Sequence, residues 1–141
     1  MLLGGRVINV DTRSIEQTNI GIVGDRLVVG AVDGKEMIDL EGAFVSPGFI
    51  DAHMHVESTM LPPSSFANLT APHGTTTVIL DPHEIANVMG IEGIKLVMDD
   101  AIGIPIDCFF TASSCVPASP LENSGATLLA DDLEPLFQDD R

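Results

Sequence analysis

The sequence predicts an α/β fold in which parallel βαβ units follow a small antiparallel β segment. Two observations support this prediction. Strand and helix patterns alternate from residue 43 onward, and short apolar runs separated by turn residues precede residue 43. Alternating strands and helices indicate a parallel sheet, whereas short runs with Gly-Asp or Asp-Gly between them favour hairpins. We therefore expect two parts, a small β segment over residues 1–42 and an α/β part over residues 43–141.

The N-terminal segment contains four short strand patterns. They cover residues 6–10, 18–23, 26–30 and 37–40. Val and Ile recur in these runs, and Gly24-Asp25 separates the second from the third. Because tight turns of this kind join antiparallel neighbours, the runs predict a small antiparallel sheet.

Three strand-and-helix pairs follow in the α/β part. The predicted strands cover residues 44–56, 75–80 and 104–110, and the predicted helices cover 62–69, 85–102 and 131–137. The longest helix is predicted from apolar residues at nearly helical spacing, in spite of Gly90 and Gly93. A (β/α) barrel has eight strands in about 250 residues, and an open doubly wound sheet needs fewer strands. Three units therefore indicate an incomplete fold, that is, a fragment.

Composition excludes several classes of function. The chain of 141 residues has 21 acidic against 6 basic side chains and a formal net charge of −15. Such a charge repels phosphates and anionic headgroups, so we expect no nucleic-acid partner and no membrane attachment. No apolar run approaches the ~20 residues of a membrane span, and no secretory signal is present. The two cysteines do not suggest a disulfide framework, which favours the cytoplasm.

The strongest chemical signal is Asp51-Ala52-His53-Met54-His55, at the end of the first α/β strand. Residues two apart in a strand point to the same side, so both imidazoles can bind one metal ion. Asp51 lies on the same face and is predicted to accept the N–H of a ligand imidazole. The alternative is a pair of solvated histidines. The end of a barrel strand, where catalytic residues collect, favours the metal.

The run Asp81-Pro82-His83-Glu84 has two interpretations. As the start of a helix, Asp81 would be the N-cap, Pro82 the first helical residue, and Glu84 the return partner of a capping box. The same turn follows the second α/β strand on the side where a site would form. The second interpretation therefore places His83 or Glu84 in a substrate pocket.

Four other side chains have both a functional and a structural interpretation. Glu57 and Ser58 directly follow the histidine pair, so they are candidates for substrate contact, although exposed loop residues are common there. Cys115 is predicted to line a pocket rather than to act as a nucleophile. His73 precedes a glycine at a helix end, where the helix dipole favours a cation, and we expect no catalytic role for it.

Two rival chemistries are excluded by spacing. His55-Val56-Glu57 matches half of the zinc cytidine-deaminase signature, but Cys108 and Cys115 are too far apart for its Cys-x-x-Cys half. No Gly-rich phosphate-binding motif follows a strand, so nucleotide-phosphate binding is not expected.

Residues 47–55 resemble the first barrel strand of the amidohydrolase superfamily, metal hydrolases whose first two ligands are a His-x-His pair. Further segments resemble the adenine deaminase family in particular. They are Val56-Glu57-Ser58-Thr59-Met60, residues 72–78, Asp81-Pro82-His83-Glu84-Ile85-Ala86-Asn87-Val88 and Ser113-Ser114-Cys115-Val116-Pro117-Ala118. The resemblance covers essentially the whole chain.

The resemblance implies a TIM-type barrel preceded by part of a composite β-sandwich, which agrees with the predicted parts. It also implies hydrolysis of adenine to hypoxanthine and ammonia at a binuclear manganese or iron centre, in a homo-oligomeric complete enzyme. Metals of this kind lower the pKa of bound water, so that hydroxide can attack C6 of the ring. An acidic side chain then transfers the proton to the leaving amine.

The match has limits. The family's bridging Glu, its two later histidines and its catalytic Asp have no counterpart in this sequence, and Glu122 precedes the expected bridging position. No catalytic residue is therefore identified within the chain, and we expect the chain alone to be inactive. Two alternatives stay open: another cyclic-amide amidohydrolase, of dihydroorotase or deacetylase type, and a non-catalytic remnant.

Overall fold

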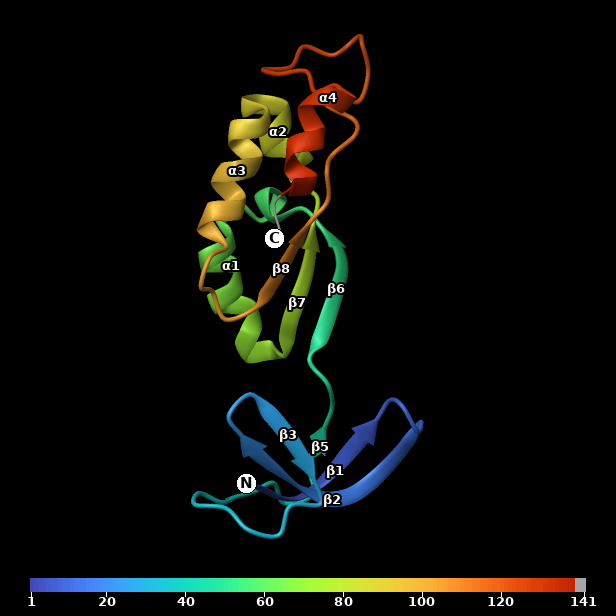
Figure 1. Cartoon of the computed structure of the whole chain (residues 1–141), viewed down its shortest axis with the longest axis vertical. Helices are drawn as coiled ribbons and strands as arrows, with labels where there is room; N and C mark the ends of the chain where they lie inside the picture. Colours follow the sequence, from blue (N-terminus) through green and yellow to red (C-terminus); the bar gives the residue numbers. More distant parts are fainter. Residues whose placement is uncertain (139–141) are drawn as a thin grey trace. The chain divides into compact units, whose positions relative to one another are not determined.

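The computed structural model describes residues 1–138, and the chain divides into two compact units between Pro47 and Gly48 (Figure 1). Within the described residues, no helix is both long and apolar enough to cross a membrane.

The first unit is a five-stranded sheet. Its strands are β1 (Leu2–Asn9), β2 (Ser14–Val23), β3 (Arg26–Val29), β4 (Ile38–Asp39) and β5 (Phe44–Val45). The order is β3-β2-β1-β4, with β5 also on β1, and β1, β2 and β3 pair antiparallel as predicted. However, β4 and β5 run parallel to β1. The sheet is therefore mixed, because the chain returns through residues 30–37 before it reaches the free edge of β1.

The predicted strand over residues 44–56 is two strands in the structure. β5 completes the first sheet, and β6 (Phe49–Met54) begins the second unit. Pro47 has no amide donor to continue a ladder. Gly48 approaches β7 so closely that a Cβ there would lie 2.1 Å from Thr76 Oγ1. The units consequently divide between Pro47 and Gly48, whereas the sequence suggested a boundary between residues 42 and 43.

The second unit contains a parallel sheet in the order β6-β7-β8, where β7 is Thr75–Leu80 and β8 is Asp107–Phe110. This confirms the predicted βαβ arrangement. The connections contain α1 (Pro63–Thr70), α2 (His83–Met89) and α3 (Ile91–Asp100), with α4 (Ala130–Leu133) after β8. Short 3-10 helices cover Val56–Thr59, Ala71–His73 and Glu134–Gln138. The three strands form an open sheet, not a closed barrel.

The predicted helix over residues 85–102 is broken at Gly90, which has φ 65° and ψ −146° and separates α2 from α3. Few residues other than glycine adopt this conformation. Gly93 lets the two helices approach, since a Cβ there would lie 2.8 Å from the carbonyl oxygen of Ile85. The helical spacing of the apolar residues therefore continues through a sharp turn of the backbone.

Two buried clusters hold the second unit together. The first joins β7 to α1 and α3 and consists of Val56, Ala67, Val78, Leu80, Val97 and Ile106. The second joins α2 and α3 to the segment after β8 and consists of Ala86, Ile94, Met98 and Val116. These clusters hold the carboxyl ends of the strands, and the loops that follow them, in fixed positions.

Candidate metal centre

The carboxyl ends of β6, β7 and β8 lie at one edge of the parallel sheet and bring three segments together. His53 lies on β6 and His55 directly after it, while Asp81 follows β7. Backbone pairing continues past the strand ends: the Asp81 N–H donates to Met54 O at 2.9 Å, and the Thr111 N–H donates to Leu80 O at 2.9 Å. The edge predicted to carry the site is therefore well ordered by hydrogen bonds.

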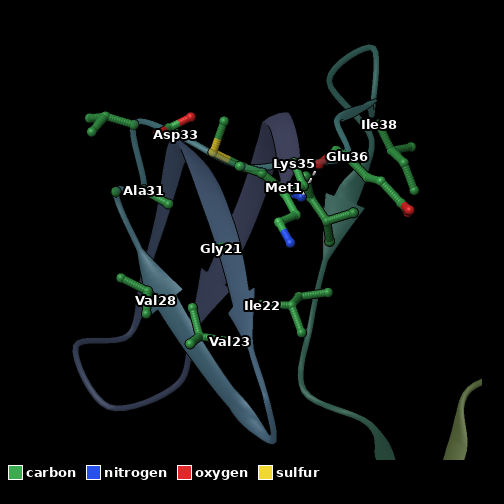
Figure 2. Close-up of a pocket in the computed structure, with 14 residues that line it drawn as sticks. Met1, Gly21, Ile22, Val23, Val28, Ala31, Asp33, Lys35, Glu36 and Ile38 are labelled. Carbon is green, nitrogen blue, oxygen red and sulfur yellow. Dashed lines mark hydrogen bonds between the residues drawn. The ribbon is translucent and has the colours of Figure 1, made fainter.

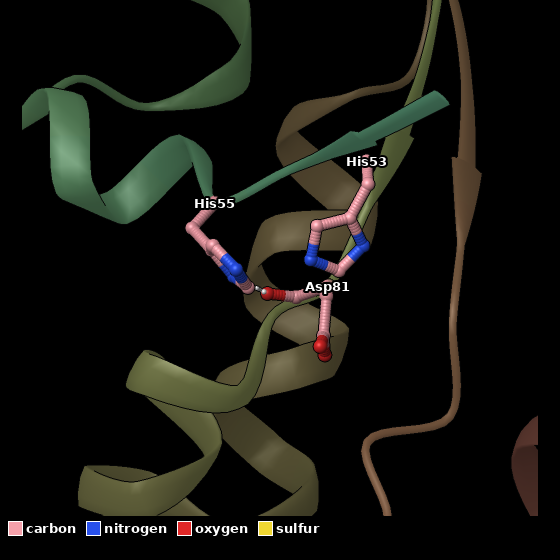
Figure 3. Close-up of side chains that lie close together, drawn as sticks. All are labelled: His53, His55 and Asp81. Carbon is pink, nitrogen blue, oxygen red and sulfur yellow. Dashed lines mark hydrogen bonds between the residues drawn. The ribbon is translucent and has the colours of Figure 1, made fainter. Parts of the chain in front are cut away.

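The His-x-His pair places two imidazole rings close together at the end of β6. The ring centroids of His53 and His55 are 4.8 Å apart. His55 Nδ1 lies 2.9 Å from the carbonyl oxygen of Asp81 (Figure 3). A carbonyl oxygen only accepts hydrogen bonds, so Nδ1 donates, and a neutral ring in this arrangement has the lone pair of Nε2 available. Metal-bound histidines typically donate their other N–H to such an acceptor.

A carboxylate completes the group. The ligand atoms of His53, His55 and Asp81 all lie within 4.8 Å of one another. Imidazoles suit zinc and iron, and carboxylates suit manganese, so two imidazoles with one carboxylate fit a divalent transition metal. The residues present therefore fit a divalent metal ion.

A second group lies beside the first and shares one histidine with it. The ligand atoms of His55, His83 and Glu84 also lie within 4.8 Å of one another. The ring centroids of His55 and His83 are 4.5 Å apart. Because Nδ1 of His55 is occupied, this side chain has one nitrogen left for one ion. The two groups are therefore alternative positions for a metal that His55 binds.

Asp81 is held as an anion. Its Oδ1 accepts a hydrogen bond from Ser113 Oγ at 2.5 Å, and its Oδ2 lies 3.6 Å from His83 Nδ1. Burial alone would raise the pKa of the carboxyl group, but the Ser113 hydrogen bond and the neighbouring His83 outweigh it, so the pKa is lowered. Asp81 is therefore ionised at neutral pH, as a metal ligand must be.

The predicted capping box is wrong. The N-cap of α2 is Pro82, whose side chain makes no capping hydrogen bond. Asp81 binds Ser113 instead, and Glu84 Oε1 accepts a hydrogen bond from Ser58 Oγ at 2.5 Å. Glu57 takes over the capping, because its Oε1 accepts the backbone N–H of Ile85 at 3.2 Å. The helix is thus capped from a distant loop, which local spacing does not reveal.

Asp51 has a different partner from the predicted one. Its Oδ1 accepts the backbone N–H of His53 at 3.2 Å. The acceptor for a ligand imidazole is the main chain of Asp81, which binds His55. Asp51 thus supports the backbone between the two histidines.

His83 and Glu84 line a hollow of about 370 Å³ next to the metal groups. Its other lining residues are Asn87, Cys115, Ala118 and Glu122. His83 Nδ1 and Asn87 Oδ1 are buried and have no hydrogen-bond partner. Unsatisfied buried polar atoms are costly unless a ligand or water satisfies them. The structure therefore brings His83, Glu84 and Cys115 together around one space, whereas Glu57 and Ser58 support α2 and Glu84.

A larger hollow, of about 820 Å³, lies in the first unit (Figure 2). Its lining includes Met1, Ile22, Val28 and Ile38, and it contains none of the predicted site residues. It lacks the cluster of histidines and carboxylates that marks the edge of the second sheet.

The two cysteines are expected to react differently with a thiol reagent. Cys115 is exposed, whereas burial, together with Asp107, raises the pKa of Cys108 to about 11. Since the thiolate is the reactive form, Cys115 should react rapidly at about pH 8 in the folded chain and Cys108 only after denaturation. Absorbance measurement with Ellman's reagent, with Cys115→Ser as the control, checks this. Rapid reaction of two thiols before denaturation would contradict it.

Sequence reasoning missed Asp81 as a candidate ligand and Ser113 as its partner. Both residues follow a predicted strand at the same sheet edge, and this position was the available signal. The run around Pro82 also fits a helix cap, and that pattern by itself indicates no ligand.

Comparisons with known proteins find relatives that match nearly the whole chain. The model of the Amidohydrolase family matches residues 44–139. A protein named adenine deaminase from Geobacillus kaustophilus is 46% identical over 142 residues, which covers 100% of this chain and 25% of that protein. Proteins of the same name from Clostridium acetobutylicum and Thermosipho africanus are 48% and 50% identical, over 96% and 94% of the chain and 24% of each protein. The chain thus spans about a quarter of the length of these relatives.

Proposed function

Since this chain belongs to the amidohydrolase family, we propose that it supplies His53 and His55 as metal ligands to an enzyme that hydrolyses adenine to hypoxanthine and ammonia. The observation that carries the proposal is the His-x-His pair at the strand end, with His55 Nδ1 hydrogen-bonded and its Nε2 free. The names of the relatives support adenine as the substrate. The family generally uses a divalent metal, and we propose manganese or iron.

Each residue of the edge has a separate task in this proposal. His53 and His55 bind the ion, and the carbonyl oxygen of Asp81 keeps the His55 ring oriented. A divalent ion held by these residues would supply Lewis-acid chemistry, because such an ion lowers the pKa of bound water. The carboxylate of Asp81 adds negative charge beside the two imidazoles and favours the binding of a cation.

The hollow beside the metal groups is the proposed place for the purine. His83 and Glu84 line it and offer hydrogen-bonding groups to a heterocycle. Ser58 keeps Glu84 in place through its 2.5 Å hydrogen bond, and Glu57 holds the start of α2. In this proposal, Glu57 and Ser58 act on the pocket through α2.

A chimera tests the function. The chain replaces the matching segment of the Geobacillus kaustophilus relative, and the purified protein is loaded with Mn²⁺ and assayed for ammonia release from adenine. We expect deamination within about tenfold of the unmodified relative, because the chain is 46% identical to it over 142 residues, which cover 100% of the chain. The isolated chain, as a control, is expected to release no ammonia.

Failure of the chimera would be informative. A folded, metal-loaded chimera that leaves adenine unchanged but hydrolyses dihydroorotate would support the alternative of a cyclic-amide hydrolase. A folded chimera without activity on either substrate would favour a non-catalytic remnant.

A further inference from the structure

Ser113 is a buried polar residue next to the metal groups. Its side chain lies in the segment after β8, and only 3% of the residue is exposed. Its hydroxyl donates to Asp81 Oδ1 at 2.5 Å. Hydrogen bonds to a carboxylate are stronger than those between neutral groups, and a buried hydroxyl is rarely retained without a partner. This contact is therefore a specific link between the ends of β7 and β8.

The backbone of Asp81 is already held on both sides. Its N–H donates to Met54 O at 2.9 Å, and its carbonyl oxygen binds His55 Nδ1. These two contacts leave the side-chain torsions of Asp81 free. Three groups lie against the carboxylate: the Ser113 hydroxyl donates to Oδ1 at 2.5 Å, His83 Nδ1 lies 3.6 Å from Oδ2, and Thr111 is a further hydrogen-bonding neighbour. The Ser113 contact is the shortest distance given for them, so this hydroxyl has the largest part in setting the direction of the carboxylate oxygens.

Ser113 can do this because its own segment is anchored. Two residues earlier, the Thr111 N–H donates to Leu80 O at 2.9 Å, which continues the pairing of β8 with β7. Three residues later, Val116 is 2% exposed in the second core cluster, and its carbonyl oxygen accepts the Leu128 N–H at 2.8 Å. The hydroxyl thus projects from a segment fixed at both ends.

We infer that Ser113 is a positioning residue for the metal centre: its hydroxyl holds the carboxylate of Asp81 in the orientation that groups it with His53 and His55. The inference rests on the metal binding proposed above. Ser113 contributes no ligand itself. Outer partners of this kind typically change metal affinity 10- to 100-fold when they are removed.

A calorimetric titration of the purified chain with Mn²⁺ tests the inference. Ser113→Ala is expected to weaken Mn²⁺ binding about 10- to 100-fold. Ser124→Ala is the matched control, because Ser124 also donates a hydrogen bond, to Ala126 O at 2.6 Å, but belongs to neither metal group. The control should bind Mn²⁺ within about twofold of the parent chain. Equal affinity of Ser113→Ala and the parent would overturn the inference.

A double-mutant cycle separates positioning from general stability. If Ser113 acts through Asp81, Ser113→Ala should cause no further loss of Mn²⁺ affinity in an Asp81→Ala background. The same loss in both backgrounds would show that Ser113 acts independently of Asp81. Urea unfolding of the metal-free variants reports any purely structural effect. If Ser113→Ala does not fold, Ser113→Thr decides: retained affinity supports the inference, and lost affinity contradicts it.

The same titrations distinguish the two proposals. Unchanged Mn²⁺ binding in His53→Ala would refute the metal centre itself. If His53→Ala loses Mn²⁺ affinity and Ser113→Ala keeps it, only the role of Ser113 is refuted.

Discussion

Replacement of His53 or His55 by alanine is expected to reduce Mn²⁺ affinity more than about 100-fold. This loss is larger than the one expected for a residue that only holds a ligand in place, such as Ser113. Each substitution removes an imidazole from a group whose ligand atoms lie within 4.8 Å of one another. The two losses should not add, because residues that act as one unit fail together. In the chimera, each single variant should lose metal-dependent deamination almost as completely as the double variant.

His73→Ala is the matched control for this prediction. His73 ends a 3-10 helix in front of Gly74 and belongs to neither metal group. Its replacement should leave Mn²⁺ affinity and turnover within about twofold of the parent. Metal analysis beside steady-state kinetics measures both quantities. Full activity with metal still bound in His53→Ala would show that the ligands have been assigned wrongly.

Gly125→Ala is expected to destabilise the second unit by about 1–3 kcal/mol. A Cβ at this position would lie 2.2 Å from the carbonyl oxygen of Val88, and the Gly125 N–H donates to Asn87 O at 2.8 Å. Both contacts are to the backbone of α2, which cannot rotate away as a side chain would. The added methyl group should therefore separate the segment after β8 from α2. The chain contains no Trp or Tyr, so urea unfolding is best followed by circular dichroism.

Gly103→Ala is the control for the close approach. Gly103 has φ +73° but no atom within 4 Å of a Cβ built there, so its replacement costs backbone strain alone, about 1 kcal/mol. Gly125→Ala should cost more than this control. Equal midpoints of unfolding for the two variants would mean that the packing of this segment on α2 is looser than the structure indicates.

Local sequence patterns were sufficient for the order of the elements in the second unit. The strand over residues 75–80 agrees with β7, and the predicted helix over residues 62–69 differs from α1 by one residue at each end. Apolar runs and turn residues are properties of neighbouring positions, so periodicity reveals them directly. The helix break at Gly90 was missed because apolar spacing reports which face is buried, not whether the backbone continues.

The sequence by itself also determined the His53–His55 pair, since residues two apart on a strand share a face in any sheet. Only the tertiary structure decided their surroundings. Asp81 was predicted to cap a helix, yet it binds Ser113, and Glu57 rather than Asp81 caps α2. The residues in these contacts are 28 or more positions apart in the chain. They meet only because β6, β7 and β8 run parallel and end at one edge, an alignment that depends on packing in three dimensions and leaves no local pattern in the sequence.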